Sequence, residues 1–543
     1  MFRYKFAAGL TIILALVAVA LSVGGSPKPA AAANFAVTKT ADTADGTCDS
    51  DCSLREAVIA ANASAGLDFI SLPSGTYSLT IVGGGEDSAL TGDLDITDNL
   101  EINGAGLANT TIEVGAGDDR VFDVIIVSSI TATLLTATDL QLRNGKGDVG
   151  FGCECGGGIL VRTDAWLRLV NTRVANNAAT GGTLSTGGGI DNGGTLTLEN
   201  TVVSGNTADF AGGINNGPAA SFTMTGGSIE SNTASGSVGG VELPSGSAAT
   251  LIRAQVIGNT AGGSGGGLDV SGSLNMSESN VGGNSAAGGA GINVSGGTVS
   301  IDASSVHTNF ASGDGAGIFS NGTITLTNST ISSNGAGGLG SGILNNVVGN
   351  LTSTNSTIAG NNAPSGLHNF GTAQLKNTII GSNKGADCVV PAAVTSLGHN
   401  LDSDGTCMLS GPGDLPNRDP RIGPLAFTTG PTFWHPLLGD SPAIDAGDDN
   451  GCPSTDQRGT TRPLDGNGDG TPVCDIGSYE IFQEIAPTPS PGPSVTPVQP
   501  IAVPETGGPA GRAGLPLWHM VVALSALAGA AAVSFRVACR CRD

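Results

Sequence analysis

Glu242 and Asp269 are the two side chains whose types and spacing best suit hydrolytic chemistry. Each directly follows a Gly-Gly-apolar step, and such steps recur every 24 to 27 residues. If each step occupies one coil of a stacked β-structure, the residues after the steps form an outward-pointing column whose members lie about 4.8 Å apart. Retaining glycosidases hold two carboxyl groups about 5 Å apart. The pair is therefore a candidate catalytic pair, and an acidic, solvated stripe is the alternative. In chain order the column is Asp191, Asn215, Glu242, Asp269, Asn293, Phe319 and Leu344.

A candidate calcium loop lies near the end of the chain. Residues 465–470 alternate oxygen-bearing side chains with glycine, as in the first half of a calcium-binding loop. The twelfth position is Ile476, where such a loop has a bidentate Glu, although Asp475 is adjacent. The candidate ligands of a structural calcium ion are Asp465, Asn467, Asp469 and Asp475. An Asp/Gly turn without metal is the alternative, and the sequence requires no other cofactor.

Cysteine and histidine are arranged differently along the chain. Six cysteines form local pairs, Cys48 with Cys52, Cys388 with Cys407 and Cys452 with Cys474, and we expect disulfides there if the protein is exported. Cys153 and Cys155 form a fourth pair, although a disulfide between cysteines so close in sequence is strained. The histidines lack the spacing of metal ligands or of a catalytic triad, which favours turn or surface positions for His307, His368, His399, His435 and His519.

The elements that must position these residues come from a repeat. Apolar residues recur at Ile190, Ile214, Val241, Leu268, Ile292, Ile318, Ile343 and Leu367, and an Asn recurs with the same period at Asn206, Asn232, Asn259, Asn284, Asn309, Asn334 and Asn361. Short β-branched patches lie between these positions, separated by Gly, Asn and Ser. This pattern predicts a β-solenoid with one repeat per coil, because no single coil could bury its apolar face alone. It disfavours disorder, because disordered segments do not keep apolar positions in register. The buried Asn residues are expected to hydrogen-bond to one another along the axis.

Residues 52–57, Cys-Ser-Leu-Arg-Glu-Ala, begin a short predicted helix. Ser53 and Glu56 have the spacing of a capping box, and Leu54, Ala57 and Val58 lie on one face. The string resembles the N-terminal module named after these residues, which is found on exported bacterial proteins that continue as right-handed parallel β-helices. The repeats similarly resemble those of polymorphic outer-membrane adhesins. We expect the helix to cover the first coil.

The C-terminal third changes character after about residue 386, where Pro, Asp and Cys increase. The strings at 441–447, Ser-Pro-Ala-Ile-Asp-Ala-Gly, and at 474–480, Cys-Asp-Ile-Gly-Ser-Tyr-Glu, resemble the C-terminal region called a choice-of-anchor domain. That resemblance implies a cap followed by a surface anchor. The sequence and its resemblances together predict an all-β fold: a right-handed parallel β-helix of about a dozen coils, with a short N-terminal capping helix and an irregular, disulfide-containing C-terminal cap.

Both ends of the chain carry targeting signals. Residues 1–33 match a secretory signal peptide, and a retained N-terminal anchor is the alternative. Near the C-terminus, Val503-Pro504-Glu505-Thr506-Gly507 precedes an apolar run and three arginines, which resembles a sortase sorting signal. The resemblance implies cleavage between Thr506 and Gly507, although Val503 stands where Leu is usual. A retained membrane helix is the alternative.

These features give an expected domain order and an expected location. The order is 1–33 signal peptide, 34–66 capping module, 67–385 parallel β-helix, 386–482 C-terminal cap, 483–502 Pro-rich spacer and 503–543 sorting signal or membrane anchor. The protein is expected to be exported and held at the cell envelope by a sortase or a membrane anchor.

The net charge and the repeat pattern limit the classes of partner and of function to consider. The formal net charge of −24 makes nucleic acid and anionic lipid unfavourable partners. We expect a non-enzymatic, adhesin-like or envelope-structural protein that displays a long polar face to a glycan or another surface. The alternative is a surface polysaccharide lyase or glycoside hydrolase of the β-helix type.

Overall fold

The computed structural model describes residues 32–126, 132–147, 155–181, 185–427 and 431–482. All of them belong to one compact unit. No helix among these residues is long and apolar enough to cross a membrane. The predicted signal peptide, Pro-rich spacer and sorting signal, with Thr506 and Gly507, lie outside the described residues.

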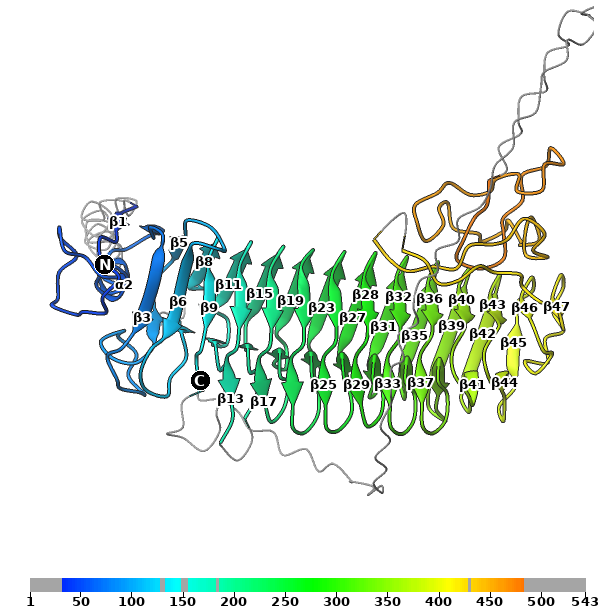
Figure 1. The fold of residues 1–543 in the computed structure, drawn as a ribbon, viewed down its shortest axis with the longest axis horizontal. Coiled ribbons are helices and arrows are strands. Elements are labelled where there is room, and N and C mark those ends of the chain that lie inside the picture. The colour runs from blue at the N-terminus through cyan, green and yellow to red at the C-terminus, as the bar shows by residue number, and fades with distance from the viewer. Residues whose placement is uncertain (1–31, 127–131, 148–154, 182–184, 428–430, 483–543) are drawn as a thin grey trace, which may run out of the picture. The chain divides into compact units, whose positions relative to one another are not determined.

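The described residues form parallel sheets whose strands stack coil upon coil (Figure 1). The predicted apolar column from Ile190 to Leu367 is in register from strand to strand, and all its members are fully buried. Strands alternate buried aliphatic residues with outward Thr or Ser because successive side chains point to opposite faces. The predicted all-β parallel solenoid is confirmed, and the twelve strands of sheet C agree with about a dozen coils.

Three long sheets and one short sheet make up the walls. Sheet A contains β1 (Asn34–Ala36), β2 (Asp68–Ser71), β5 (Leu100–Asn103), β8 (Leu134–Thr138), β11 (Trp166–Val170), β15 (Thr195–Glu199), β19 (Ser221–Thr225), β23 (Ala248–Ile252), β27 (Ser273–Ser277), β31 (Thr298–Asp302), β35 (Thr323–Thr327), β39 (Asn350–Thr354), β42 (Thr372–Lys376) and β45 (Val394–Ser396). Sheet B contains β3 (Gly75–Leu79), β6 (Thr110–Val114), β9 (Gln141–Arg143), β12 (Arg173–Ala175), β16 (Val202–Ser204), β20 (Ser228–Glu230), β24 (Gln255–Ile257), β28 (Asn280–Gly282), β32 (Ser305–His307), β36 (Thr330–Ser332), β40 (Thr357–Ala359), β43 (Ile379–Gly381), β46 (Leu401–Asp402) and β47 (Leu415–Pro416). Sheet C contains β4 (Leu94–Ile96), β7 (Phe122–Val124), β10 (Ile159–Val161), β14 (Ile190–Asn192), β18 (Ile214–Asn216), β22 (Val241–Leu243), β26 (Leu268–Val270), β30 (Ile292–Val294), β34 (Ile318–Ser320), β38 (Ile343–Asn345), β41 (Ser365–Asn369) and β44 (Ala386–Val389). Sheet D contains β13 (Ala178–Ala179), β17 (Thr207–Ala208), β21 (Thr233–Ala234), β25 (Thr260–Ala261), β29 (Ser285–Ala286), β33 (Phe310–Ala311) and β37 (Gly335–Ala336).

A ladder of buried asparagines runs between sheets B and D. The side-chain amide of Asn284 donates to Oδ1 of Asn309 at 3.0 Å and to the carbonyl of Val256 at 2.9 Å. Its own Oδ1 accepts both the backbone and the side-chain N–H of Asn259. The predicted hydrogen bonding along the axis is therefore present. It links Asn177, Asn206, Asn232, Asn259, Asn284, Asn309, Asn334, Asn361 and Asn383.

Helix α2 (Leu54–Asn62) packs against β1, β2 and β4, the first strands of the solenoid. It begins with the predicted capping box. Ser53 Oγ accepts the backbone N–H of Glu56 at 3.1 Å, and the Glu56 carboxylate accepts the backbone N–H of Ser53 at 2.7 Å. The apolar face of the helix is buried, including Leu54, Ala57 and Val58. A disulfide between Cys48 and Cys52 joins the segment that leads into the helix.

Arg55, the basic residue of the Cys-Ser-Leu-Arg-Glu string, has a structural role. Its side chain is fully buried and pairs with Asp42, with 2.7 Å between Nε and Oδ1. Its remaining N–H groups donate to the backbone carbonyls of Ala89, Gly92 and Asp93. Arg55 therefore holds the loop that leads into β4 in place.

The sheets continue beyond the predicted boundary at residue 385. Strands β44, β45 and β46 pair in parallel with β41, β42 and β43, and β47 extends sheet B further. The Gly-Gly step and the regular spacing are lost in these last coils, so the sequence repeat ends before the structural repeat.

The irregular segment from about residue 420 to 482 packs on the outer face of sheet B (Figure 1). Side chains of β32, β36 and β40 bond directly to it, in the pairs Ser305 with Phe433, Thr330 with Gln457, Ser332 with His435 and Thr357 with Ser478. An irregular, disulfide-containing C-terminal region was predicted. Its position along the side of the coils was not.

Candidate functional site

The predicted pair is brought together by strand register. Glu242 in β22 is the partner of Asp269 in β26, and Asp269 is in turn the partner of Asn293 in β30. Neighbouring strands lie about 4.8 Å apart, so adjacency of the two acidic residues was predicted correctly. The same register holds for the whole predicted column from Asp191 to Leu344.

The predicted exposure of this column is wrong for most of its members: Asn215, Glu242 and Phe319 are half-buried, and the other four are buried. Asp269 is only 2% exposed, and its oxygens accept hydrogen bonds from Asn293 Nδ2 at 2.8 Å and from Ser295 Oγ. The turn before the Gly-Gly step covers it: at Gly265, with φ of +74°, an added Cβ would lie 3.0 Å from Asp269 Cβ. Asp191 and Leu344 are buried as well. A covered, hydrogen-bonded Asp269 suits a structural role better than that of a nucleophile, and the column is not a solvated stripe.

The predicted calcium ligands are occupied by hydrogen bonds of their own. Asp465 accepts the backbone N–H groups of Gly468 and Gly470, and Asp469 accepts that of Thr471. Asn467 Oδ1 accepts the N–H of Asp469. Asp475 lies elsewhere, fully buried, and accepts the N–H groups of Asp445 and Ile481. The structure therefore shows a series of Asx turns at 465–471, and calcium binding by this loop stays a prediction.

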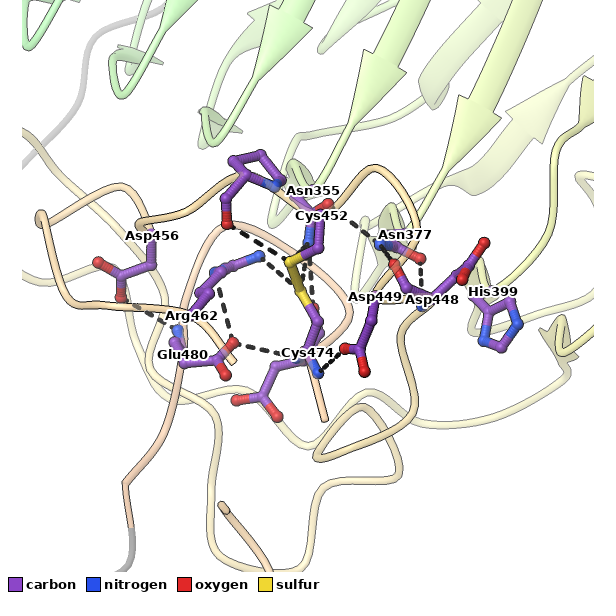
Figure 2. The surroundings of a disulfide bond; sticks show 12 residues. Asn355, Asn377, His399, Asp448, Asp449, Cys452, Asp456, Arg462, Cys474 and Glu480 are labelled. Carbon is purple, nitrogen blue, oxygen red and sulfur yellow. Dashed lines mark hydrogen bonds and ion pairs between the residues drawn. A yellow bond between two sulfur atoms is a disulfide. The ribbon is translucent and has the colours of Figure 1, made fainter. Parts of the chain in front are cut away.

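The disulfide between Cys452 and Cys474 joins the C-terminal segment where it meets the solenoid (Figure 2). Asn355 Nδ2 donates to Cys474 Sγ at 3.3 Å, and Asn377 bonds both backbone groups of Asp448. A second disulfide links Cys388 to Cys407. Cys155 is also disulfide-bonded, and Cys153 lies outside the described residues.

The four described histidines are buried or half-buried rather than on an open surface, and His399 bonds the carbonyl of Ala446 in the C-terminal segment. His307 lies with its ring centroid 4.2 Å from that of Phe433, and burial lowers its pKa to about 4. His435 bonds Ser332 Oγ and the carbonyl of Gly423. His368 stacks on Phe370. His307 and His435 therefore belong to the contact between the C-terminal segment and sheet B, while His519 lies outside the described residues.

The outer face of sheet A is a continuous array of hydroxyl side chains. Each strand from β15 to β42 turns three residues outward, and most of these are Thr or Ser. The middle row, in strand order, is Thr197, Thr223, Thr250, Asn275, Ser300, Thr325, Thr352 and Gln374, and its members are aligned by the parallel register. Only Glu199, Asp302 and Lys376 carry charge among the outward positions of these strands. The array is nearly neutral on a chain of net charge −24.

Trp166 stands at one end of this face. It is the first residue of β11, in register with Thr195 of β15, and its side chain is 50% exposed. An exposed indole presents a flat apolar surface and an N–H donor. Its exposure could not be predicted from the sequence, because a single Trp in a strand is more often buried.

A group of aspartates that was not predicted lies in the first coils. Asp93, Asp95 and Asp123 each bring a carboxyl oxygen within 4.8 Å of the others. Burial raises the pKa of Asp95 to about 7, although the N–H of Ala89 donates to Oδ2, and nearby Asp123 adds to the rise. Burial also raises the pKa of Asp93 well above its usual range, against the opposing effect of Arg120. The irregular spacing of the first coils provides no register from which the sequence could align Asp95 with Asp123.

No protein-family model and no curated protein matches this sequence. Similar solved structures include the A-module of mannuronan C-5 epimerase AlgE6 from Azotobacter vinelandii, with 14% identity over 67% of this chain and 98% of that chain, at a TM-score of 0.40. Others are pectate lyase Pel9A, with 12% identity over 84% and 98% at 0.35, and the A-module of A. vinelandii mannuronan C-5 epimerase AlgE4, with 14% identity over 71% and 99% at 0.29. At such TM-scores the likenesses carry no argument about chemistry, and the fold rests on the strand pairing itself.

Proposed function

We propose that this chain is an exported, surface-anchored β-solenoid that binds a neutral polysaccharide along the outer face of sheet A. The observation that carries the proposal is the in-register, nearly neutral array of hydroxyl side chains from β15 to β42. The predicted signal peptide and sorting signal support export and anchoring. The disulfides are compatible with an oxidising compartment.

The chemistry of the array suits a polymer of neutral sugars. A Thr or Ser hydroxyl both donates and accepts hydrogen bonds, as sugar hydroxyls do. Threonine in a strand is restricted at χ1, so little side-chain entropy is lost on binding. Equivalent hydroxyls repeat along the stacking direction at about 4.8 Å, which lets an extended ligand make the same contact repeatedly. The net charge of −24 disfavours polyanionic glycans, because like charges repel over the whole surface.

Cleavage of a polysaccharide, by hydrolysis or by elimination, is the alternative function and has less support. Its sequence basis was the Glu242 and Asp269 pair, and Asp269 is covered by the turn at Gly265 and hydrogen-bonded to Asn293. A general acid or nucleophile must be within reach of a substrate. The covered position of Asp269 therefore weighs against catalysis by this pair.

The test is retention of the full-length chain on a panel of neutral and acidic insoluble polysaccharides, with assays for new reducing or unsaturated ends. We expect retention on a neutral polymer without new ends. Thr223→Lys, which places a long charged side chain in the middle row, should weaken binding about tenfold, equivalent to about 1.4 kcal/mol. The matched control is Thr233→Lys, since Thr233 is exposed on sheet D.

Two outcomes would overturn the proposal. One is equal loss of retention in both variants, which would mean that sheet A is not the binding face. The other is release of new chain ends that Glu242→Gln abolishes, which would make the protein an enzyme.

A further inference from the structure

Three buried aspartates of the first coils are arranged as cation ligands. Asp95 in β4 and Asp123 in β7 are register partners in sheet C, and Asp93 directly precedes β4. One carboxyl oxygen from each lies within 4.8 Å of the other two, and the side chains of Asp93, Asp95 and Asp123 are 5%, 0% and 1% exposed. Oxygens bound to one Ca²⁺ at about 2.3–2.6 Å can be nearly 5 Å apart, so one ion could touch all three.

Two arginines pair with part of this group. Asp119 is buried beside it and accepts the N–H of Asp93 at 3.2 Å. Arg120 Nη1 lies 3.1 Å from Asp123 Oδ2 and 3.4 Å from Asp93 Oδ2, and Arg162 bonds both oxygens of Asp123. Asp123 thus pairs with both guanidinium groups and Asp93 with one, whereas Asp95 has no ion-pair partner among the described residues.

Asp95 supplies an independent observation. Its Oδ2 accepts the N–H of Ala89 at 2.7 Å, whereas its Oδ1 is buried and has no hydrogen-bond partner. A buried carboxyl oxygen that lacks a donor calls for an explanation, since such groups are nearly always satisfied in folded proteins. A cation bound between the three aspartates would satisfy it.

A second group of three aspartates in the described residues differs from the first in its hydrogen bonding. Asp387, Asp402 and Asp404 are equally close together. Every one of their six carboxyl oxygens accepts a hydrogen bond from a nearby backbone or side-chain donor. That group is satisfied by its own loop, and nothing in it calls for a ligand.

The surroundings of Asp95 are held in place by Arg55, and a cavity lies nearby. Arg55 fixes the carbonyls of Ala89, Gly92 and Asp93, so the loop before β4 is anchored to helix α2. A partly open cavity of about 250 Å³ lies next to the group and is lined in part by Gly92 and Asp119.

We propose that Asp93, Asp95 and Asp123 bind a hard divalent cation of the Ca²⁺ type that stabilises the first coils of the solenoid. Carboxylate oxygens within 4.8 Å of one another suit a hard divalent cation, and Ca²⁺ accepts an irregular set of oxygen ligands more readily than Mg²⁺, which requires near-ideal octahedral geometry. This site is distinct from the loop at 465–475, where no predicted ligand has a buried oxygen that lacks a hydrogen-bond partner.

The test is calorimetric titration of the chelator-treated full-length chain with CaCl₂, repeated for three variants. Asp95→Asn should abolish one bound Ca²⁺ per chain or weaken it at least about tenfold, because a charged ligand is lost. Asp469→Asn and Asp404→Asn are matched controls from the predicted loop and the self-satisfied group, and they should leave this binding event unchanged. Absence of Ca²⁺ binding, or binding that Asp469→Asn removes and Asp95→Asn does not, would overturn the proposal.

A second measurement needs no variant and so does not depend on the folding of Asp95→Asn. Hydrogen exchange of the unmodified chain is followed with Ca²⁺ and with chelator. Binding at Asp93, Asp95 and Asp123 should slow exchange in residues 86–124 and leave residues 190–345 unchanged. Equal exchange of residues 86–124 in both conditions contradicts the site.

Discussion

Glu56 shows how a single buried carboxylate can hold the start of a fold. It accepts hydrogen bonds from the backbone N–H of Ser53 and of Asp45 and from the hydroxyl of Thr43. Burial opposes ionisation, but these donors and the nearby Lys39 ammonium outweigh it and lower the pKa of Glu56 to about 2. The ionised form is therefore the one that folding selects, and its partners come from both sides of the Cys48–Cys52 disulfide.

Because the folded-state pKa of Glu56 is lower than its ordinary value of 4.5, its contribution to stability is present above about pH 4.5 and is lost as pH falls towards 2. We expect Glu56→Gln to destabilise the N-terminal cap at pH 7 by about 1–3 kcal/mol, because an amide cannot accept all three hydrogen bonds. The difference from the unmodified chain should shrink between pH 4.5 and 2. Hydrogen exchange of residues 53–62 at several pH values measures both effects.

The control for this prediction is Glu278→Gln. Glu278 forms a largely exposed pair with Arg253, and such pairs contribute little to stability. A pH-independent difference for Glu56→Gln, or an equal effect of the control, would show that the carboxylate charge is not what matters.

At the scale of the element, the asparagine ladder is the feature that ties one coil to the next outside the sheets. Each member satisfies a backbone N–H of the preceding coil and a carbonyl of sheet B, so the turns between sheets B and D leave few buried groups unpaired. Two features of the sequence therefore define how the regular coils align, the buried apolar column and the asparagine ladder. The register of the whole solenoid follows from their common period.

Asn284→Ala should therefore destabilise the solenoid far more than a surface change does. It leaves the backbone N–H and one side-chain N–H of Asn259 without partners and removes a bond to the carbonyl of Val256, and each buried group left unpaired costs about 1–3 kcal/mol. We expect a loss of roughly 3 kcal/mol or more, measured as a lower thermal midpoint and faster exchange in the coils on either side. Asn275→Ala, at an exposed position of β27, is the control. A loss no larger than that of Asn275→Ala would contradict the role of the ladder.

At the scale of the whole described unit, the C-terminal segment lies along the solenoid and is joined to it by polar contacts. Gln457 is the clearest example: its Oε1 accepts Thr330 Oγ1 at 2.6 Å, and its Nε2 donates to the carbonyl of Ser304 at 3.1 Å. Asn328 and Asn355 add bonds to the same segment. The outer face of β32, β36 and β40 is therefore covered, while that of sheet A over the same coils carries exposed and half-buried hydroxyl residues.

Gln457→Ala should loosen this segment without unfolding the coils beneath it. The substitution removes all of the bonds of a fully buried amide, including those to Ser304 and Thr330. We expect faster hydrogen exchange and faster proteolysis within residues 420–482 and no change in residues 190–300. Gln374→Ala on the exposed face of β42 is the control. Simultaneous loss of protection in both regions would show that the segment and the solenoid unfold as one.

The regular coils could be derived from the sequence alone, because a stacked parallel structure turns a constant period into aligned columns. Ile190 to Leu367, the asparagine ladder and the adjacency of Glu242 and Asp269 all follow from that rule. The capping box of α2 could also be derived, since it depends on residues three apart.

Only the tertiary structure decided the features that depend on irregular loops or distant segments. The turn at Gly265 buries Asp269, which no count of spacings reveals. The first coils have unequal loops, so the meeting of Asp93, Asp95 and Asp123 could not be aligned from the sequence. Gln457 contacts Thr330 across 127 residues because the chain folds back along sheet B after its last coil. Periodic contacts are determined by local sequence, whereas these contacts depend on the path of the chain between them.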